Sequence, residues 1–157
     1  MLIKNTIMAL AEQNSHRHIY IADDDQDDRI FFSEAMLEVD PDVILKEAQD
    51  GAELMEILHT LSDLLPEVIF LDLNMPKKNG FDCLEEIRKL KGAIREVKVI
   101  MFSTSSDPRD IEKAMELGAS FYAVKPSGFD TLKSFLEQVL QMDWRCRAND
   151  RAKFRLI

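Results

Sequence analysis

The chain has 157 residues, of which 46% are hydrophobic and 31% charged, and its formal net charge is -9. This size and composition fit one folded domain with its own core, and the negative charge argues against non-specific nucleic-acid binding. No apolar run approaches the roughly 20 residues of a membrane span, and the two cysteines lack metal-type spacing, so we expect a cytoplasmic protein.

Three regions are expected along the chain. Residues 1–17 form an N-terminal extension in which Ile3, Ile7 and Leu10 have helical spacing, so a short amphipathic helix and a frayed leader are both open. Residues 18–142 form the domain. Residues 143–157 form a basic C-terminal tail, which is either a solvated end or a segment that docks a partner or a second copy.

Five short apolar segments within 18–142 predict strands, and each is followed by a helical pattern. The expected strands are 18–22, 43–47, 68–71, 97–102 and 120–124. Apolar residues at helical spacing predict helices around 30–37, from 50 to 65, around 81–90, from 107 to 118 and from 127 to 142. This alternation with short connections predicts a parallel sheet covered on both faces by helices.

Chemically useful side chains follow four of the five strands. They are Asp23 and Asp24 after the first strand, Asp72 after the third, Ser103 and Thr104 after the fourth, and Lys125 after the fifth. Because the carboxyl ends of parallel strands gather at one edge of the sheet, we expect these side chains to lie together. Asp72 ends a continuous apolar strand and precedes a polar loop, so we expect it at the centre of the site.

The expected cluster of carboxylates requires a cation. Two carboxylates about 4 Å apart repel by roughly 4 kcal/mol at an effective dielectric near 20. Lys125 supplies one positive charge, and Mg²⁺ supplies two and prefers oxygen ligands. A metal beside Asp72 would neutralise phosphoryl oxygens during transfer, which makes Asp72 a candidate nucleophile that forms an acyl phosphate. The Ser103 hydroxyl and the Lys125 ammonium would bond the new oxygens.

Four separated motifs resemble those of the response-regulator receiver domain, the phospho-acceptor module of two-component signalling. They are ADDD after the first strand, FLDLNMP at the third, MFST at the fourth and YAVKP at the fifth. The resemblance covers about residues 18–142. It implies a flavodoxin-like α/β fold with a doubly wound, five-stranded parallel sheet in the strand order 2-1-3-4-5.

The resemblance implies that Asp72 is the phosphorylated residue and part of a Mg²⁺ site. Asp24 and Asp72 would bind the ion directly, Asn74 through its backbone carbonyl, and Asp23 through water. The acid pair that faces Asp72 is either Asp23 with Asp24 or Asp24 with Asp25. The last apolar residue of the first strand favours the earlier pair.

The resemblance also assigns roles at the fourth and fifth strands. Ser103 matches the switch hydroxyl, Lys125 the family's lysine, and Tyr122 the aromatic switch. The bond between Lys125 and Pro126 is expected to be cis, which X-Pro bonds allow at small cost. Thr104 departs from the small residue usual at its position, and we expect it to narrow access to the acceptor.

These roles imply a single-domain response regulator rather than an enzyme with a turned-over substrate. A sensor histidine kinase or a histidine phosphotransfer protein would phosphorylate Asp72, and slow autodephosphorylation would reset it. The signal would pass through a changed surface on segments 107–118, 120–124 and 127–142, a face that would also serve a homodimer. Receivers with an ADDDxDD opening often serve phytochrome-type or hybrid kinases. We expect no nucleic acid, membrane or small-molecule partner beyond phosphodonors.

Two other classes remain open. One is a small Mg²⁺-dependent phosphohydrolase of the haloacid-dehalogenase type, which also forms an aspartyl phosphate. That class needs a second acid two residues after its nucleophile, where this chain has Asn74, and usually a cap domain. The other is a degenerate receiver that only binds partners, against which the intact set of Asp24, Asp72 and Lys125 argues.

Overall fold

The fold is a single parallel sheet between two layers of helices. The computed structural model describes residues 16–61, 64–144 and 151–157, so the possible helix in the N-terminal extension lies outside the described residues. The sheet has five strands in the order β2-β1-β3-β4-β5, all paired in parallel, which confirms the predicted fold class. The elements are β1 (His18–Ala22), α2 (Gln26–Val39), β2 (Ile44–Ala48), α3 (Gly51–His59), β3 (Val68–Leu71), α4 (Gly80–Arg88), the 3-10 helix η1 (Ala93–Glu96), β4 (Lys98–Ser103), α5 (Pro108–Glu116), β5 (Phe121–Val124), α6 (Phe129–Leu140) and α7 (Arg151–Phe154).

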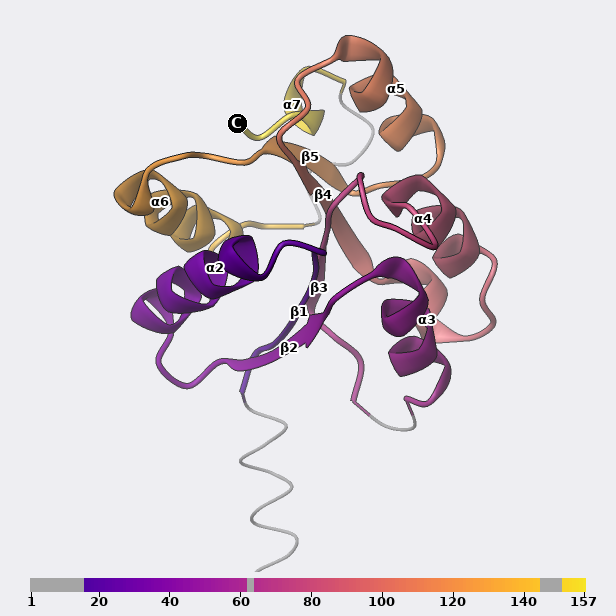
Figure 1. The fold of residues 1–157 in the computed structure, drawn as a ribbon, viewed down its shortest axis with the longest axis horizontal. Coiled ribbons are helices and arrows are strands. Elements are labelled where there is room, and N and C mark those ends of the chain that lie inside the picture. Colours follow the sequence, from indigo (N-terminus) through magenta and orange to yellow (C-terminus); the bar gives the residue numbers. More distant parts are fainter. Residues whose placement is uncertain (1–15, 62–63, 145–150) are drawn as a thin grey trace, which may run out of the picture.

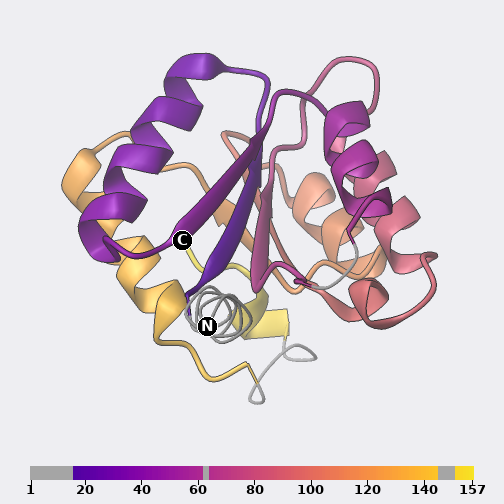
Figure 2. The same ribbon diagram turned by 90° about the horizontal axis from the view of Figure 1, so that it is seen from below.

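Helices cover both faces of the sheet. Helices α2 and α6 lie on one face, and α3, α4 and α5 lie on the other (Figures 1 and 2). The central strand β3 is buried along its whole length and alternates between the two layers, as a strand between two helical layers must. Val68 and Phe70 belong to the core on the α2/α6 side, and Ile69 and Leu71 to the core on the α3/α4/α5 side.

Side-chain caps begin four of the helices. Asp25 caps α2, Asp50 caps α3, Asn79 caps α4 and Asp107 caps α5, each by accepting a backbone N–H of the first turn. Strand bounds agree with the predictions to within one residue. The largest difference among the helices is at α3, which ends at His59 rather than at 65; at Thr60 the backbone amide and the side-chain hydroxyl both donate to the Ile57 carbonyl, three residues back, in place of the helical bond.

The C-terminal residues lie along the outer edge of β5 (Figure 1). A parallel bridge forms at Tyr122, the Leu156 amide donates to the Tyr122 carbonyl at 2.8 Å, and the Val124 amide donates to the Ile157 carbonyl at 3.2 Å. Phe154 is 2% exposed and packs in the same core layer as Tyr122, while Leu156 and Ile157 pack against the other layer. The last residues of the predicted basic tail therefore extend the sheet and close its β5 edge.

No helix among the described residues is long and apolar enough to cross a bilayer.

Candidate functional site

The acidic residues meet because β1 and β3 are neighbours in the sheet and end at the same level. Ala22 pairs with Leu71 at the end of both strands, and the Asp72 amide donates to the Ala22 carbonyl at 3.0 Å. One carboxylate oxygen each of Asp23, Asp24 and Asp72 lies within 4.8 Å of the others. Asp23 and Asp72 are only 1% and 7% exposed, whereas Asp24 is exposed. This arrangement offers oxygen ligands to a divalent cation at the carboxyl edge of the sheet.

The third acid of the ADDD motif has a different position. Asp25 is the N-cap of α2, and its Oδ1 accepts the Asp27 amide at 2.8 Å and the Asp28 amide at 3.3 Å. Its own amide donates to Asp23 Oδ1 at 3.0 Å. The structure therefore brings Asp23 and Asp24 to Asp72, while Asp25 caps the helix that follows.

The loop after β3 is held close to Asp72 by a glycine. The Gly80 amide donates to the Leu73 carbonyl at 2.9 Å, and a Cβ at Gly80 would lie only 2.3 Å from the Asp72 carbonyl oxygen. Only glycine allows this approach. The loop also brings the Asn74 backbone amide close enough to the Asp72 carboxylate to lower its pKa, so Asn74 lies beside the acid cluster.

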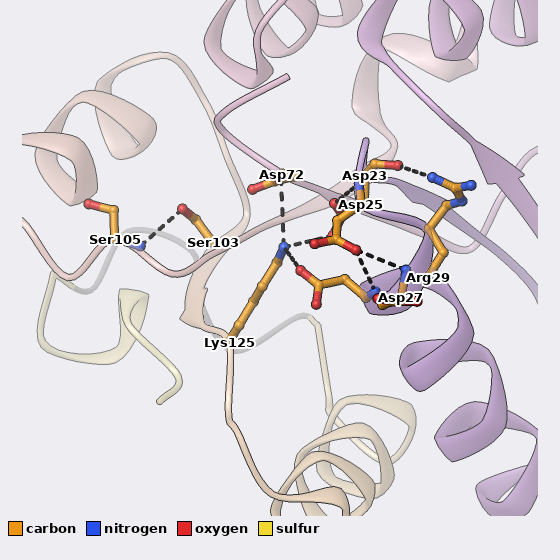
Figure 3. Close-up of polar contacts among 9 residues, drawn as sticks. Asp23, Asp25, Asp27, Arg29, Asp72, Ser103, Ser105 and Lys125 are labelled. Atoms are coloured by element: carbon orange, nitrogen blue, oxygen red, sulfur yellow. Dashed lines mark hydrogen bonds and ion pairs between the residues drawn. The ribbon is translucent and has the colours of Figure 1, made fainter. Parts of the chain in front are cut away.

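Lys125 extends from the end of β5 into the acid cluster (Figure 3). Its Nζ lies 2.6 Å from Asp23 Oδ2, 3.0 Å from Asp28 Oδ2 and 3.7 Å from Asp72 Oδ2. The ammonium thus joins three carboxylates that come from two strand ends and the first turn of α2. The predicted cis bond between Lys125 and Pro126 is wrong: the bond is trans, the form that the X-Pro amide itself favours by about 0.5–1 kcal/mol.

The electrostatic environment changes the ionisation of Asp72 and Lys125. Burial, reinforced by the charges of Asp23 and Asp24, raises the pKa of Asp72 to about 7 despite the lowering effects of Lys125 and the Asn74 amide. Burial alone would lower the pKa of Lys125, but its hydrogen bond to Asp23 and the charges of Asp72 and Asp23 outweigh burial and raise that pKa. A buried carboxylate that is costly to ionise alone is a suitable ligand and nucleophile once a cation is beside it.

Ser103 and Tyr122 meet at Ser105 in the loop after β4. Ser103 and Tyr122 are both fully buried. The Ser103 hydroxyl accepts the Ser105 amide at 3.1 Å, and the Tyr122 hydroxyl donates to the Ser105 carbonyl at 2.8 Å. The Ser105 hydroxyl in turn donates to Asp110 Oδ2 of α5 at 2.6 Å. These contacts connect the end of β4 to β5 and α5, while Thr104 between them is exposed.

Two site residues had no assigned role in the sequence analysis. Asp28 contacts the Lys125 ammonium, and Arg29 Nη1 donates to the Asp23 carbonyl at 2.7 Å while its Nε lies 3.4 Å from Glu47. Both belong to the first turn of α2, which starts directly at the acid cluster. The sequence could have indicated these two residues by their position in that first turn. Which side chains of the turn face the site depends on the rotation of the helix, and only the structure shows it.

Comparison with known proteins places most of the chain in one family. The model of the response regulator receiver domain matches residues 19–137. The chain is 35% identical over 103 residues to the probable C4-dicarboxylate response regulator DctR of Bacillus subtilis, a match that covers 66% of this chain and 43% of that protein. The chain therefore corresponds to less than half of this relative's length.

Two solved structures with a similar fold are also those of response regulators. The phosphorylated cyanobacterial phytochrome response regulator RcpA is similar with a TM-score of 0.73 and 26% identity, covering 83% of this chain and 95% of that one. The Mn²⁺-bound form of response regulator Rcp1 is similar with a TM-score of 0.68 and 25% identity, covering 78% and 91%.

Proposed function

Because the chain belongs to the response regulator receiver domain family, we propose that it accepts a phosphoryl group on Asp72 and passes on a signal through the resulting change in its surface. The observation that carries this proposal is the position of Asp72. Its carboxylate is buried, shares a 4.8 Å cluster with Asp23 and Asp24, and lies 3.7 Å from the Lys125 ammonium. These are the groups that phosphoryl transfer to a carboxylate requires.

The three carboxylates fit a Mg²⁺ ion. The donors are all oxygens, two of the three are buried, and their spacing allows one ion to contact them together. In our proposal Asp24 and Asp72 are direct ligands, the Asn74 backbone carbonyl is a third, and Asp23 acts through water. The Mn²⁺-bound form of the similar regulator Rcp1 supports a divalent ion in this fold. The ion supplies positive charge that neutralises phosphoryl oxygens during transfer.

Asp72, Lys125 and Ser103 have different roles in the phosphoryl transfer. A carboxylate oxygen of Asp72 attacks the phosphorus of a phosphohistidine, a P–O bond forms, and the P–N bond breaks with its electron pair remaining on the imidazole. The Lys125 ammonium and the Ser103 hydroxyl donate hydrogen bonds to the transferred phosphoryl oxygens. Hydrolysis of the acyl phosphate later restores the free carboxylate. The protein is thus a signalling switch and not an enzyme with a small-molecule substrate.

The signal leaves the site through the contacts at Ser105. Phosphorylation adds nearly two negative charges and draws Ser103 toward Asp72, which breaks or shifts its bond to the Ser105 amide. Tyr122 bonds the carbonyl of the same residue and therefore responds to the same movement. The surface of α5, β5 and α6 changes as a result, and we propose this face for a downstream partner or a homodimer.

We propose a sensor histidine kinase, or a histidine phosphotransfer protein, as the donor of the phosphoryl group. The likeness to the phytochrome response regulator RcpA supports a kinase of the phytochrome type.

Intact-mass analysis tests the proposal. The protein is incubated with Mg²⁺ and acetyl phosphate, and we expect one phosphoryl adduct that requires Mg²⁺ and is absent in Asp72→Asn. Asp42→Asn, an exposed acid outside the site, is the charge-matched control and should form the adduct. Turnover of many phosphate esters would support the hydrolase class instead. Absence of both the adduct and Mg²⁺ binding would support a degenerate receiver.

A further inference from the structure

The ammonium of Lys125 is shared unequally among its carboxylate partners. Its two short contacts, 2.6 Å and 3.0 Å, go to Asp23 and Asp28, and the contact to Asp72 is the longest at 3.7 Å. A Lys ammonium has three N–H donors, and both short contacts are hydrogen bonds. In the unphosphorylated structure both hydrogen bonds of the lysine thus go to Asp23 and Asp28, while its contact with the phosphoryl acceptor is only the longer ion pair at 3.7 Å (Figure 3).

Asp28 differs from Asp23 in its surroundings. Asp23 is almost fully buried, and its Oδ1 also accepts the Asp25 amide, so it is fixed inside the site. The side chain of Asp28 is 43% exposed, and among the described residues its carboxylate is bonded to Lys125 alone. Asp28 can therefore be solvated when the lysine leaves it, whereas the contact to Asp23 is held by burial.

Phosphorylation of Asp72 changes the competition for this ammonium. The acyl phosphate carries more negative charge than the carboxylate and places oxygens on the acceptor side of Lys125. A charge-assisted bond to the phosphoryl group then competes with the bond to Asp28, and the exposed carboxylate is the one that loses least by giving up its partner.

We propose that Asp28 is a positioning residue that holds Lys125 away from Asp72 and so favours the unphosphorylated state. This inference rests on the proposed function of the site and adds to it an element of regulation outside the metal-binding acids. The first turn of α2 thereby sets how readily the lysine engages the phosphoryl group.

The test measures the binding of beryllofluoride, which mimics the phosphoryl group, at a Mg²⁺ concentration that saturates each variant. We expect Asp28→Asn to lower the half-saturating beryllofluoride concentration about three- to tenfold, the range for loss of one competing charge-assisted bond that is partly exposed. Asp27→Asn is the matched control. It removes the same charge from the same helical turn, and Asp27 is exposed, so it should leave the value within about twofold of wild type.

A double-mutant cycle separates a role through the lysine from a general effect of charge or helix stability. In a Lys125→Gln background, Asp28→Asn should have no further effect on beryllofluoride binding. Asp28→Glu, which keeps a carboxylate able to reach the ammonium, should return the value toward wild type.

The outcomes distinguish this inference from the proposed function. Wild-type protein that binds neither beryllofluoride nor a phosphoryl group overturns the proposed function and the inference together. Wild-type binding with Asp28→Asn unchanged or weakened overturns the inference alone. An equal gain in Asp27→Asn, or a gain that persists without Lys125, also overturns it, because the effect would then not pass through the lysine.

Discussion

Asp72 is buried among other acids. In this position a proton and a metal ion would bind the same carboxylate. Burial together with the charges of Asp23 and Asp24 raises its pKa to about 7, so a proton or a cation must occupy the cluster near neutral pH. Lys125 compensates only part of the negative charge because its ammonium is bonded mainly to Asp23 and Asp28. The acceptor is therefore coupled to pH and to divalent cations at once.

The affinity for Mg²⁺ should depend on pH around this pKa. Below about pH 7 the ion must displace a proton from Asp72, so the dissociation constant should fall by about fivefold between pH 6 and pH 7, about tenfold between pH 6 and pH 8, and level off above pH 8. Isothermal titration calorimetry across this range measures the effect. A dissociation constant that is flat between pH 5.5 and 8.5 would show that Asp72 does not hold a proton in competition with the metal.

The stability of the metal-free protein should fall as pH rises from about 4 to about 7. In that window the folded state holds a proton on Asp72 that the unfolded state has lost, so stability decreases with pH. Asp72→Asn removes the penalty and should raise the free energy of unfolding at pH 8 by about 2 kcal/mol, with little gain at pH 4. Urea denaturation in a chelating buffer checks this. Asp42→Asn should show no comparable gain, and an unstabilised Asp72→Asn would contradict the assigned burial penalty.

The sequence predicted which side chains lie at the acid cluster when they directly follow a strand. It did not do so for side chains in the first turn of a helix. Asp23, Asp24, Asp72 and Lys125 each follow an apolar strand, and parallel topology brings such positions together. Asp28 is one of several acids in a helical first turn, and its contact with Lys125 depends on the rotation of α2. Sequence alone gives that rotation only coarsely. The contacts at Ser105 were missed for a similar reason, since loop backbone atoms make them.

At the scale of elements, the short segment that ends the chain contributes to the sheet. Phe154 is buried in the core layer that contains Tyr122, and the strand-like pairing extends to Ile157. The sequence showed a basic tail because Arg and Lys dominate it, while the apolar residues that carry the packing are few and close to the end. The sequence left open a solvated end or docking onto a partner or a second copy, and it gave no sign of pairing with β5 of the same chain.

Truncating the buried ring should detach this segment. Phe154→Ala should destabilise the protein by about 2 kcal/mol, less than a central core substitution because the segment can separate from β5 without global unfolding. Amide exchange at Val124, which donates to the Ile157 carbonyl, should accelerate. Lys153→Ala, at an exposed neighbour, should change neither stability nor exchange. Equal protection of Val124 in wild type and Phe154→Ala would contradict the edge pairing.

The loop between β3 and α4 should tolerate no side chain at Gly80. Alanine there would place its Cβ 2.3 Å from the Asp72 carbonyl oxygen and 2.9 Å from the Leu73 Cα, both backbone atoms. We expect a loss of about 2–3 kcal/mol in stability and slower formation of the phosphoryl adduct, because the backbone of Asp72 must shift. Gly128→Ala, at the N-cap of α6, would place its Cβ no closer than 3.4 Å to the Thr131 hydroxyl and should cost no more than about 1 kcal/mol. Adduct formation and urea denaturation measure both effects.

At the scale of the whole molecule, the alternation of strands and helices was enough to predict the architecture. Continuous apolar strands such as 68–71 must be covered on both faces, and right-handed crossovers leave few arrangements of such strands. The structure confirms the order β2-β1-β3-β4-β5, which the resemblance to the receiver family implied and which the alternation alone leaves open. The extent of α3 was overestimated because apolar spacing continues past Thr60, where the amide and the hydroxyl both bond the Ile57 carbonyl and the helical pattern ends.

Mg²⁺ should stabilise the whole fold through this one edge of the sheet. At a Mg²⁺ concentration about 100 times its dissociation constant, the free energy of unfolding should increase by about 2.7 kcal/mol. Asp24→Asn should lose most of this gain, since it removes a proposed ligand, whereas Asp42→Asn should keep it. Thermal unfolding with and without Mg²⁺ gives the comparison. A full gain in Asp24→Asn would place the stabilising ion elsewhere.

The central claim is that Asp72 itself carries the phosphoryl group. Hydride reduction of the protein after incubation with acetyl phosphate converts an acyl phosphate into the corresponding alcohol, which tandem mass spectrometry can locate in the sequence. We expect a single reduced residue, at position 72, in samples that contained Mg²⁺ and not in samples with a chelator. Reduction at another acid, or none in protein that has taken up the phosphoryl group, would contradict it.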